Sequence, residues 1–251
     1  MEAIGLVWNE AIVRPMLNSL VFLYAILFNN FGIAIIAFTI IIRGLTIPLT
    51  VRQARQTRLM AGIQPKLKQL QEKHSKDKQK LSQETMRLYR SSGVSPIGCL
   101  GPLVIQMPIW IGLFQALRET LPTTPDAIIS LSQKLYSWLP AVHSAVPLSN
   151  QFTWLNLAEP DPTPILPILV GVTTWLQQKM VTVPSGDPRQ ASTNNILLWM
   201  MPIMLAVFAF GFPSGLALYW TISNIVGCVI QYFITGWTCL LYTSPSPRDR
   251  G

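Results

Sequence analysis

Charge is scarce in this chain, and acidic charge is the scarcest. Only 12% of its 251 residues are charged, and Lys plus Arg outnumber Asp plus Glu by 19 to 11. Half of the residues are hydrophobic, and the mean hydropathy is +0.37. Because a soluble domain carries about 25% charged residues, this deficit argues against a soluble fold. It favours a protein whose solvent is a bilayer.

Histidine and cysteine are also rare, which limits the chemistry that the chain can perform. The histidines, His74 and His143, both fall in predicted loops, and the three cysteines show no disulfide framework or metal-ligand spacing. No serine or carboxylate in the predicted spans has a histidine or second acid within reach in the sequence, and no glycine loop for phosphate is present. The sequence therefore predicts no catalytic residue, no metal site, no cofactor and no enzymatic activity.

Long apolar runs are what the chain has instead. A membrane-spanning helix needs about 20 mostly apolar residues. Five stretches meet that need and predict an all-α membrane protein with five transmembrane helices: Phe31–Val51, Ile97–Leu117, Thr163–Val183, Asn195–Phe212 and Leu216–Gly236.

Before the first span, apolar residues recur at helical spacing from Leu17 to Phe28. This pattern predicts an amphipathic helix that lies in the membrane interface within an external segment, residues 1–30. One long tilted span is the alternative, and the polar and small residues Asn29, Asn30 and Gly32 favour a break. At the other end, residues 237–251 predict a disordered tail, and whether it is native sequence stays open.

The positive charge is concentrated in residues 52–95, which hold far more Lys and Arg than Asp and Glu. The positive-inside rule predicts that this loop is cytoplasmic, and the more acidic loop 119–162 can then lie outside. Spans two to five lie within residues 96–236, on either side of the external loop. With the 52–95 loop in the cytoplasm and five spans in all, the N-terminus is predicted outside and the C-terminus in the cytoplasm. The net charge of +8 thus reflects topology, and no direct contact with nucleic acid is predicted.

Two apolar stripes at helical spacing lie inside this basic loop. The first runs through Leu59, Ile63, Leu67 and Leu70, and the second runs from Leu81 to Leu88. They predict a helical hairpin with a polar turn at residues 74–78. A merely solvated linker is the alternative. The basic hairpin would contact lipid headgroups or an acidic partner. Its predicted contact residues are Arg55, Arg58, Lys66, Lys68 and Lys73.

Arg43 is the one charge set deep in a predicted span. It lies nine residues before Arg52, about 13 Å along a helix at about 1.5 Å per residue, which is far for snorkelling. An arginine at depth costs about 2.5–3.5 kcal/mol and normally faces the bundle interior or water. Because no Asp or Glu occurs within the five spans, we expect a hydrated cavity around Arg43 and a functional role for it.

Neutral polar groups in the other spans supply possible neighbours for Arg43. Thr39 lies one turn before it, and further Gln, Thr, Ser and Asn residues punctuate spans two, three and five. Each alone is more typical of hydrogen bonding between helices than of a site. Their convergence around Arg43 is the hypothesis.

The segments that carry these residues resemble the YidC family of membrane-protein insertases. The similar segments cover roughly residues 15–236: Phe38–Leu49 with Arg43, Gly44 and Pro48; Gln64–Lys66; Pro96–Pro108; Ile165–Gly171 leading to Gln178–Met180; and Phe212–Tyr219 with Ser223 and Asn224. The large external domain of the Gram-negative form and a long basic C-terminal tail are not found in this sequence. The second departure puts ribosome tethering through a tail in doubt.

The resemblance implies a five-helix core that inserts newly made membrane proteins, alone or beside the Sec translocon, without hydrolysing nucleotide. It also implies a hydrophilic groove that opens to the cytoplasm and lipid and is closed to the outside. Arg43 matches the family's groove arginine, and by the same correspondence the groove would be lined by Thr39, Gln178, Trp175 and Trp220. The cytoplasmic hairpin would meet substrate first.

Two other readings remain open from the sequence: a channel or small-solute transporter that uses the same polar cavity, and a passive assembly scaffold. The predicted partners are nascent membrane proteins and lipids, with the Sec translocon and the ribosome as further candidates. The predicted location is the plasma membrane, with the thylakoid membrane as the alternative.

Overall fold

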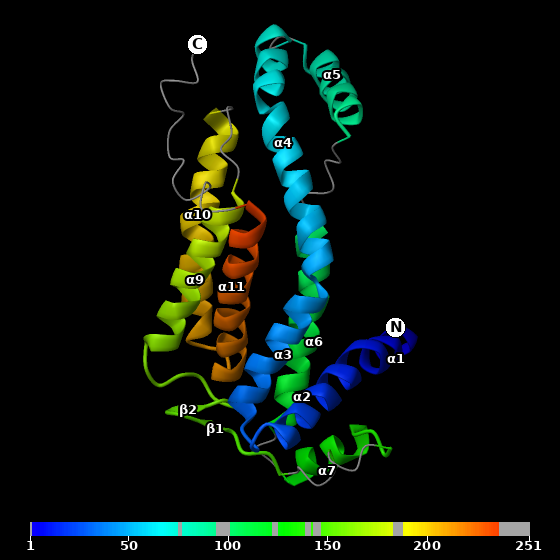
Figure 1. The fold of residues 1–251 in the computed structure, drawn as a ribbon, viewed down its shortest axis with the longest axis vertical. Helices are drawn as coiled ribbons and strands as arrows, with labels where there is room; N and C mark the ends of the chain where they lie inside the picture. The colour runs from blue at the N-terminus through cyan, green and yellow to red at the C-terminus, as the bar shows by residue number, and fades with distance from the viewer. Residues whose placement is uncertain are drawn as a thin grey trace. The chain divides into compact units, whose positions relative to one another are not determined.

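The computed structural model describes residues 2–74, 77–93, 101–121, 125–138, 142, 147–182 and 188–235. Within them the chain is almost entirely helical, and the strands are a single antiparallel pair of two residues each. The elements, in chain order (Figure 1), are α1 (Glu2–Trp8), a π-helical turn η1 (Asn9–Val13), α2 (Arg14–Ile26), α3 (Phe31–Leu45), α4 (Ile47–Lys73), α5 (Lys78–Ser91), α6 (Gly101–Thr120), α7 (Pro125–Lys134), β1 (Gln151–Phe152), β2 (Leu155–Asn156), α9 (Ile165–Val181), α10 (Pro188–Ala209) and α11 (Ser214–Thr235).

Each of the five predicted spans overlaps a helix: α3, α6, α9, α10 and α11. By length and composition alone, two stretches of the described residues suffice to cross a bilayer, Ser192–Ala209 in α10 and Ser214–Ile234 in α11. The successive helices α3 and α4 make a third if they form one broken span. The tail from residue 236 onward, including the predicted disordered segment, lies outside the described residues.

The predicted first span, Phe31–Val51, is not one continuous helix. Helix α3 ends at Leu45, and α4 begins at Ile47 with Thr46 as its N-cap residue and Pro48 in its first turn. Proline lacks a backbone N–H and disfavours helical geometry in the residue before it, whereas the first turn of a new helix tolerates it. Pro48 therefore starts a helix here instead of continuing one.

The chain divides into two compact units. The first unit contains Met1–Leu45, Val104–Thr174 and Pro202–Val226, and the second contains Thr46–Leu103, Trp175–Met201 and Gly227–Gly251. Helices α9, α10 and α11 each contribute residues to both units.

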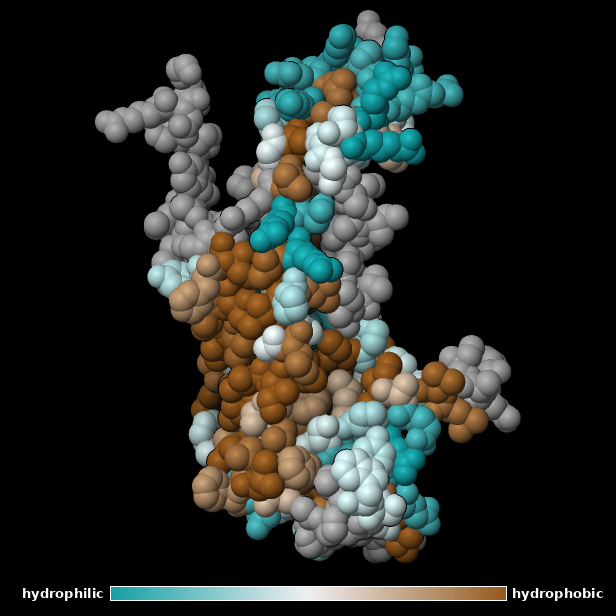
Figure 2. Space-filling model, turned by 45° about the vertical axis from the view of Figure 1, so that its right-hand side comes forward, coloured by the Kyte–Doolittle hydropathy of each residue, from teal (hydrophilic) through white to brown (hydrophobic). Residues whose placement is uncertain are grey.

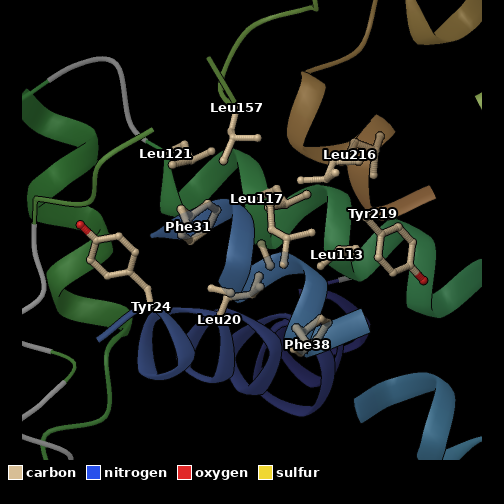
Figure 3. Packing of buried hydrophobic residues seen from close by; sticks show 14 of the residues in the cluster. Leu20, Tyr24, Phe31, Phe38, Leu113, Leu117, Leu121, Leu157, Leu216 and Tyr219 are labelled. Carbon is tan, nitrogen blue, oxygen red and sulfur yellow. The ribbon is translucent and has the colours of Figure 1, made fainter. Parts of the chain in front are cut away.

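The first unit has one extensive apolar core. Side chains from α2, α3, α6, the segment after β2 and the start of α11 point toward one another there (Figure 3). The residues Leu20, Phe31, Leu113 and Leu157 are 0% exposed. Within a membrane such close packing, rather than exclusion of water, is the main force that holds helices together.

The predicted N-terminal helix exists as α2, and its apolar stripe is part of this core. Leu17, Leu20 and Val21 are fully buried in the core of the first unit, so this part of the stripe packs on protein, whereas Phe28 at its end is 90% exposed. The opposite face exposes Phe22 and Ile26, and only that face is available to lipid headgroups. Contact of α2 with the membrane interface stays a prediction.

The break after α2 occurs close to the predicted place, but Gly32 has a different role. Phe28 and Asn29 have left-handed backbone angles, φ 58 and φ 51, and the side chain of Asn30 accepts a hydrogen bond from the N–H of Ile33 at 3.1 Å. Asn30 therefore caps α3. Gly32 lies inside α3, where a Cβ atom would overlap the ring of Phe152.

A short hairpin, β1–β2, covers the first turns of α3 and α11. Gln151 pairs with Asn156, and Phe152 pairs with Leu155. The carbonyl of Leu157 accepts from the N–H of Gly215 at 3.1 Å, and the hydroxyl of Ser214 donates to the carbonyl of Asn156 at 2.6 Å. The end of the hairpin and the residue after it thereby hold the N-terminal end of α11, where the N–H of Gly215 has no partner within the helix.

The second unit contains the predicted helical hairpin, α4 and α5, whose surface is strongly hydrophilic (Figure 2). Asp77 caps α5 by accepting from the N–H of Lys80 at 3.0 Å. The small apolar core consists of Ile63 and Leu67, with Met60, Leu88 and Tyr89 packed against them. Leu59, predicted in the stripe, is 47% exposed, because the packed face is rotated toward Met60.

Candidate functional site around Arg43

Arg43 lies in the last turn of α3, and its side chain is partly exposed. The C-terminal end of a helix carries a partial negative charge, which favours a cation at this position. Thr39, one turn earlier, is fully buried, and its hydroxyl donates to the carbonyl of Ile35 at 2.6 Å. Thr39 and Arg43 are thus neighbours on one helix face, but the Thr39 hydroxyl already has a partner in its own helix.

Ser223 of α11 accepts a hydrogen bond from Arg43. The Nε of Arg43 donates to the Oγ of Ser223 at 2.8 Å, and Ser223 is only 2% exposed. Hydrogen bonds to charged groups stabilise by about 1.5–3 kcal/mol, more than neutral ones. Sequence reasoning noted Ser223 among the polar residues of the fifth span and did not select it as a site residue.

The residue after Ser223 joins α11 to α9. The side-chain amide of Asn224 donates to the hydroxyl of Thr174 at 2.8 Å and to that of Thr173 at 3.2 Å, and all three residues are buried. The expectation that these polar groups connect helices is therefore correct. Their bonds fix the rotation of α11, and hence the direction in which Ser223 faces.

Trp220, a predicted groove residue, lies in an aromatic cluster. Its ring centroid is 5.8 Å from that of Trp110 in an edge-on arrangement, and Trp110 also contacts Phe114 and Phe212. Trp220 also lines a small apolar pocket with Leu205, Ala209, Phe212, Leu216 and Ala217. The surroundings that the structure describes for Trp220 are apolar.

Trp175 and Gln178, the remaining predicted groove residues, belong to the second unit. The Trp175 ring lies 5.6 Å from the Trp199 ring, and the Lys179 ammonium lies 4.9 Å from the Trp175 centroid. The side-chain amide of Gln178 donates to the carbonyl of Leu197 at 3.3 Å. Two buried polar atoms, the Nε1 of Trp175 and the Oε1 of Gln178, have no hydrogen-bond partner in the described part of the chain.

The predicted site residues are therefore found in two separate sets. Thr39, Arg43 and Trp220 belong to the first unit, and Trp175 and Gln178 belong to the second. Whether all five face one groove stays a prediction. Among the hairpin cations, Arg55, Lys66, Lys68 and Lys73 are exposed, and the side chain of Arg58 lies outside the described residues.

This arrangement suits binding and electrostatics. A guanidinium at the end of an apolar helix attracts anionic groups and retains water where the dielectric constant is low. Within the described residues, no three His, Cys, Asp or Glu side chains gather in a way that would hold a metal ion.

Comparison with known proteins identifies the family. The family model of the 60Kd inner membrane protein matches residues 22–239, which is most of the chain. The chain belongs to this family. The resemblance to YidC proteins that the sequence showed is thereby confirmed.

Curated relatives match nearly the whole chain. Membrane protein insertase MisCA of Bacillus subtilis (strain 168) is 34% identical over 248 residues, which are 97% of this chain and 84% of the relative. Membrane protein insertase YidC 2 of Bacillus anthracis is 37% identical over 236 residues, covering 92% of this chain and 82% of the relative.

A solved structure shares the fold. The crystal structure of an active YidC insertase, with its first transmembrane domain resolved, matches 90% of this chain with a TM-score of 0.60 and 23% identity. The chain spans about half of that protein, 47% of its length. The fold of an all-α membrane protein is thus confirmed.

Proposed function

We propose that this protein is a membrane protein insertase, which helps newly made membrane proteins to enter and fold in the bilayer. The observation that carries the proposal is the match of nearly the whole chain to relatives named insertases, and the hydrogen bond between Arg43 and Ser223 adds to it. This bond holds a cation at the end of an apolar helix, in the first unit of a chain whose relatives are named insertases.

In the proposed mechanism, a hydrated groove lowers the barrier to insertion without nucleotide hydrolysis. A groove lined by Arg43, Thr39, Gln178, Trp175 and Trp220, open to the cytoplasm and lipid, would shorten the apolar distance that a substrate's polar segment must cross. Arg43 would retain water and attract acidic residues of that segment. Weak binding lets the substrate leave sideways, because its own apolar helix is favoured in lipid. No nucleotide and no cofactor take part.

The α4–α5 hairpin would meet the substrate first. Its exposed cations, Arg55, Lys66, Lys68 and Lys73, form a basic surface that suits lipid headgroups or an acidic partner. We place Arg58 on the same surface from its position in the sequence.

The chain is an integral membrane protein, and we propose the plasma membrane as its location. Its N-terminal segment and the 119–162 loop would lie outside, and the α4–α5 hairpin and the C-terminus would lie in the cytoplasm. The substrates are nascent membrane proteins, and the Sec translocon and the ribosome are the proposed partners.

Reconstitution tests the proposal. The purified protein in liposomes should insert a small membrane protein that is added during its synthesis, and the vesicles should remain tight to ions. Ion flux without insertion would instead favour a channel or transporter. Empty liposomes and liposomes with an unrelated multi-spanning protein are the controls.

A further inference from the structure

We infer that Ser223 is a positioning residue for Arg43, and that it sets the plane in which the guanidinium meets an acidic group of the substrate. The inference rests on the proposed insertase function and adds a residue that orients the charged group of Arg43.

Ser223 accepts its hydrogen bond from the Nε of Arg43, and a bond to this atom orients the guanidinium. Nε lies between the aliphatic stem and the planar fork of an arginine, and the guanidinium has five N–H donors in a fixed geometry. The bond from Nε to Ser223 Oγ is 2.8 Å long. Fixing Nε fixes the plane of the whole fork, and a planar fork binds carboxylates best in that plane.

Ser223 is itself rigidly held. It is 2% exposed, and its neighbour Asn224 is anchored to Thr173 and Thr174 by bonds of 3.2 and 2.8 Å. Helix α11 therefore cannot rotate Ser223 away from α3 without breaking buried hydrogen bonds. All of these residues lie in the first unit.

Thr221 offers a matched control on the same helix. It is also buried, at 4% exposed, but its hydroxyl donates to the carbonyl of Ala217 at 3.0 Å within α11. Replacing Thr221 by Val removes a buried hydroxyl of similar depth. The two positions thus separate a role toward Arg43 from the general cost of losing a hydroxyl.

The experiment compares full-length wild type, Ser223→Ala, Ser223→Thr and Thr221→Val in liposomes. Two substrates are used, one with Asp and Glu in its external segment and one in which Asn and Gln replace them. For Ser223→Ala we expect insertion of the acidic substrate to fall about tenfold, the loss of a hydrogen bond to a charged group. Insertion of the neutral substrate should not change, and Ser223→Thr and Thr221→Val should behave as wild type.

Three results would overturn the inference: wild-type insertion of the acidic substrate by Ser223→Ala, an equal loss for both substrates, or a failure of Ser223→Thr to retain selectivity. If Ser223→Ala does not fold, Ser223→Cys takes its place, because a thiol has similar size and is a weak acceptor; wild-type selectivity there would equally contradict the inference. Failure of the wild type to insert either substrate would instead count against the insertase function.

Discussion

The core of the first unit and the α4–α5 hairpin differ in how much apolar surface they bury. The first unit buries Leu17, Phe31 and Leu113 completely, whereas the hairpin core is Ile63 and Leu67, each 7% exposed. Local stability follows the density of buried apolar contacts. The difference indicates that the rigid first unit holds one cation, Arg43, in a fixed geometry. The hairpin instead presents many cations on a less stable and more mobile surface.

The largest expected effect compares one leucine from each region. Leu113→Ala leaves a cavity in the first unit and should lower the free energy of unfolding by about 2–5 kcal/mol. Leu67→Ala should loosen the hairpin and leave the melting temperature of the rest nearly unchanged. Thermal unfolding in detergent measures the first effect, and proteolysis within α4 measures the second. Equal losses of melting temperature would show that the two regions unfold as one.

A smaller effect is expected at the polar contact between α2 and the C-terminal end of α7. The Asn18 amide donates to the carbonyl of Lys134 at 3.1 Å, and its oxygen accepts from the N–H of Tyr136 at 2.8 Å. Asn18→Ala leaves the N–H of Tyr136 without its partner, whereas the carbonyl of Lys134 keeps the hydrogen bond from the Nε of Arg14 at 3.0 Å. The substitution should cost about 1–3 kcal/mol, read from the melting temperature.

Ser19→Ala is the control for this position. Ser19 is exposed, and its hydroxyl donates only within α2, to the carbonyl of Pro15 at 2.7 Å. Exposed substitutions of this kind usually stay within about 0.5 kcal/mol. A similar loss of melting temperature for Ser19→Ala and Asn18→Ala would show that the Asn18 contact does not stabilise the protein.

Removal of the hairpin should change the free energy of unfolding least, but it should have a clear effect on substrate capture. Deleting Ala61–Met86 should reduce crosslinking to nascent chains by about tenfold, because each basic residue near an anionic surface contributes about 1 kcal/mol. The melting temperature of the remaining protein should stay the same. An unchanged crosslinking yield would separate the hairpin from substrate capture.

The apolar runs predicted the helices well, because a run of 20 apolar residues has few other stable structures in a bilayer. The two helices of the hairpin and the turn between them also follow from local patterns. The break at Thr46 was missed, although Pro48 was visible in the sequence. The apolar stripe of the predicted first span obscured it.

The site was predicted less completely, because its geometry depends on contacts distant in sequence. Arg43 was identified from its cost in an apolar helix, but its partner Ser223 lies 180 residues away in sequence. Gly32 was interpreted as part of a helix break, whereas its small size admits the ring of Phe152. Such packing leaves no periodic signal. The grouping of Trp175 and Gln178 with Arg43 came from the resemblance and stays a prediction.

The most direct test of the account measures insertion of the acidic and the neutralised substrate by wild type, Arg43→Ala and Arg43→Lys in liposomes. Arg43→Ala should lose about tenfold or more of the insertion of the acidic substrate, since a charge-assisted contact is removed. Arg43→Lys should retain an intermediate share of it, because the charge remains but the planar fork that Ser223 orients is lost. Equal insertion of the acidic substrate by all three proteins would contradict the central claim that Arg43 guides acidic segments into the membrane.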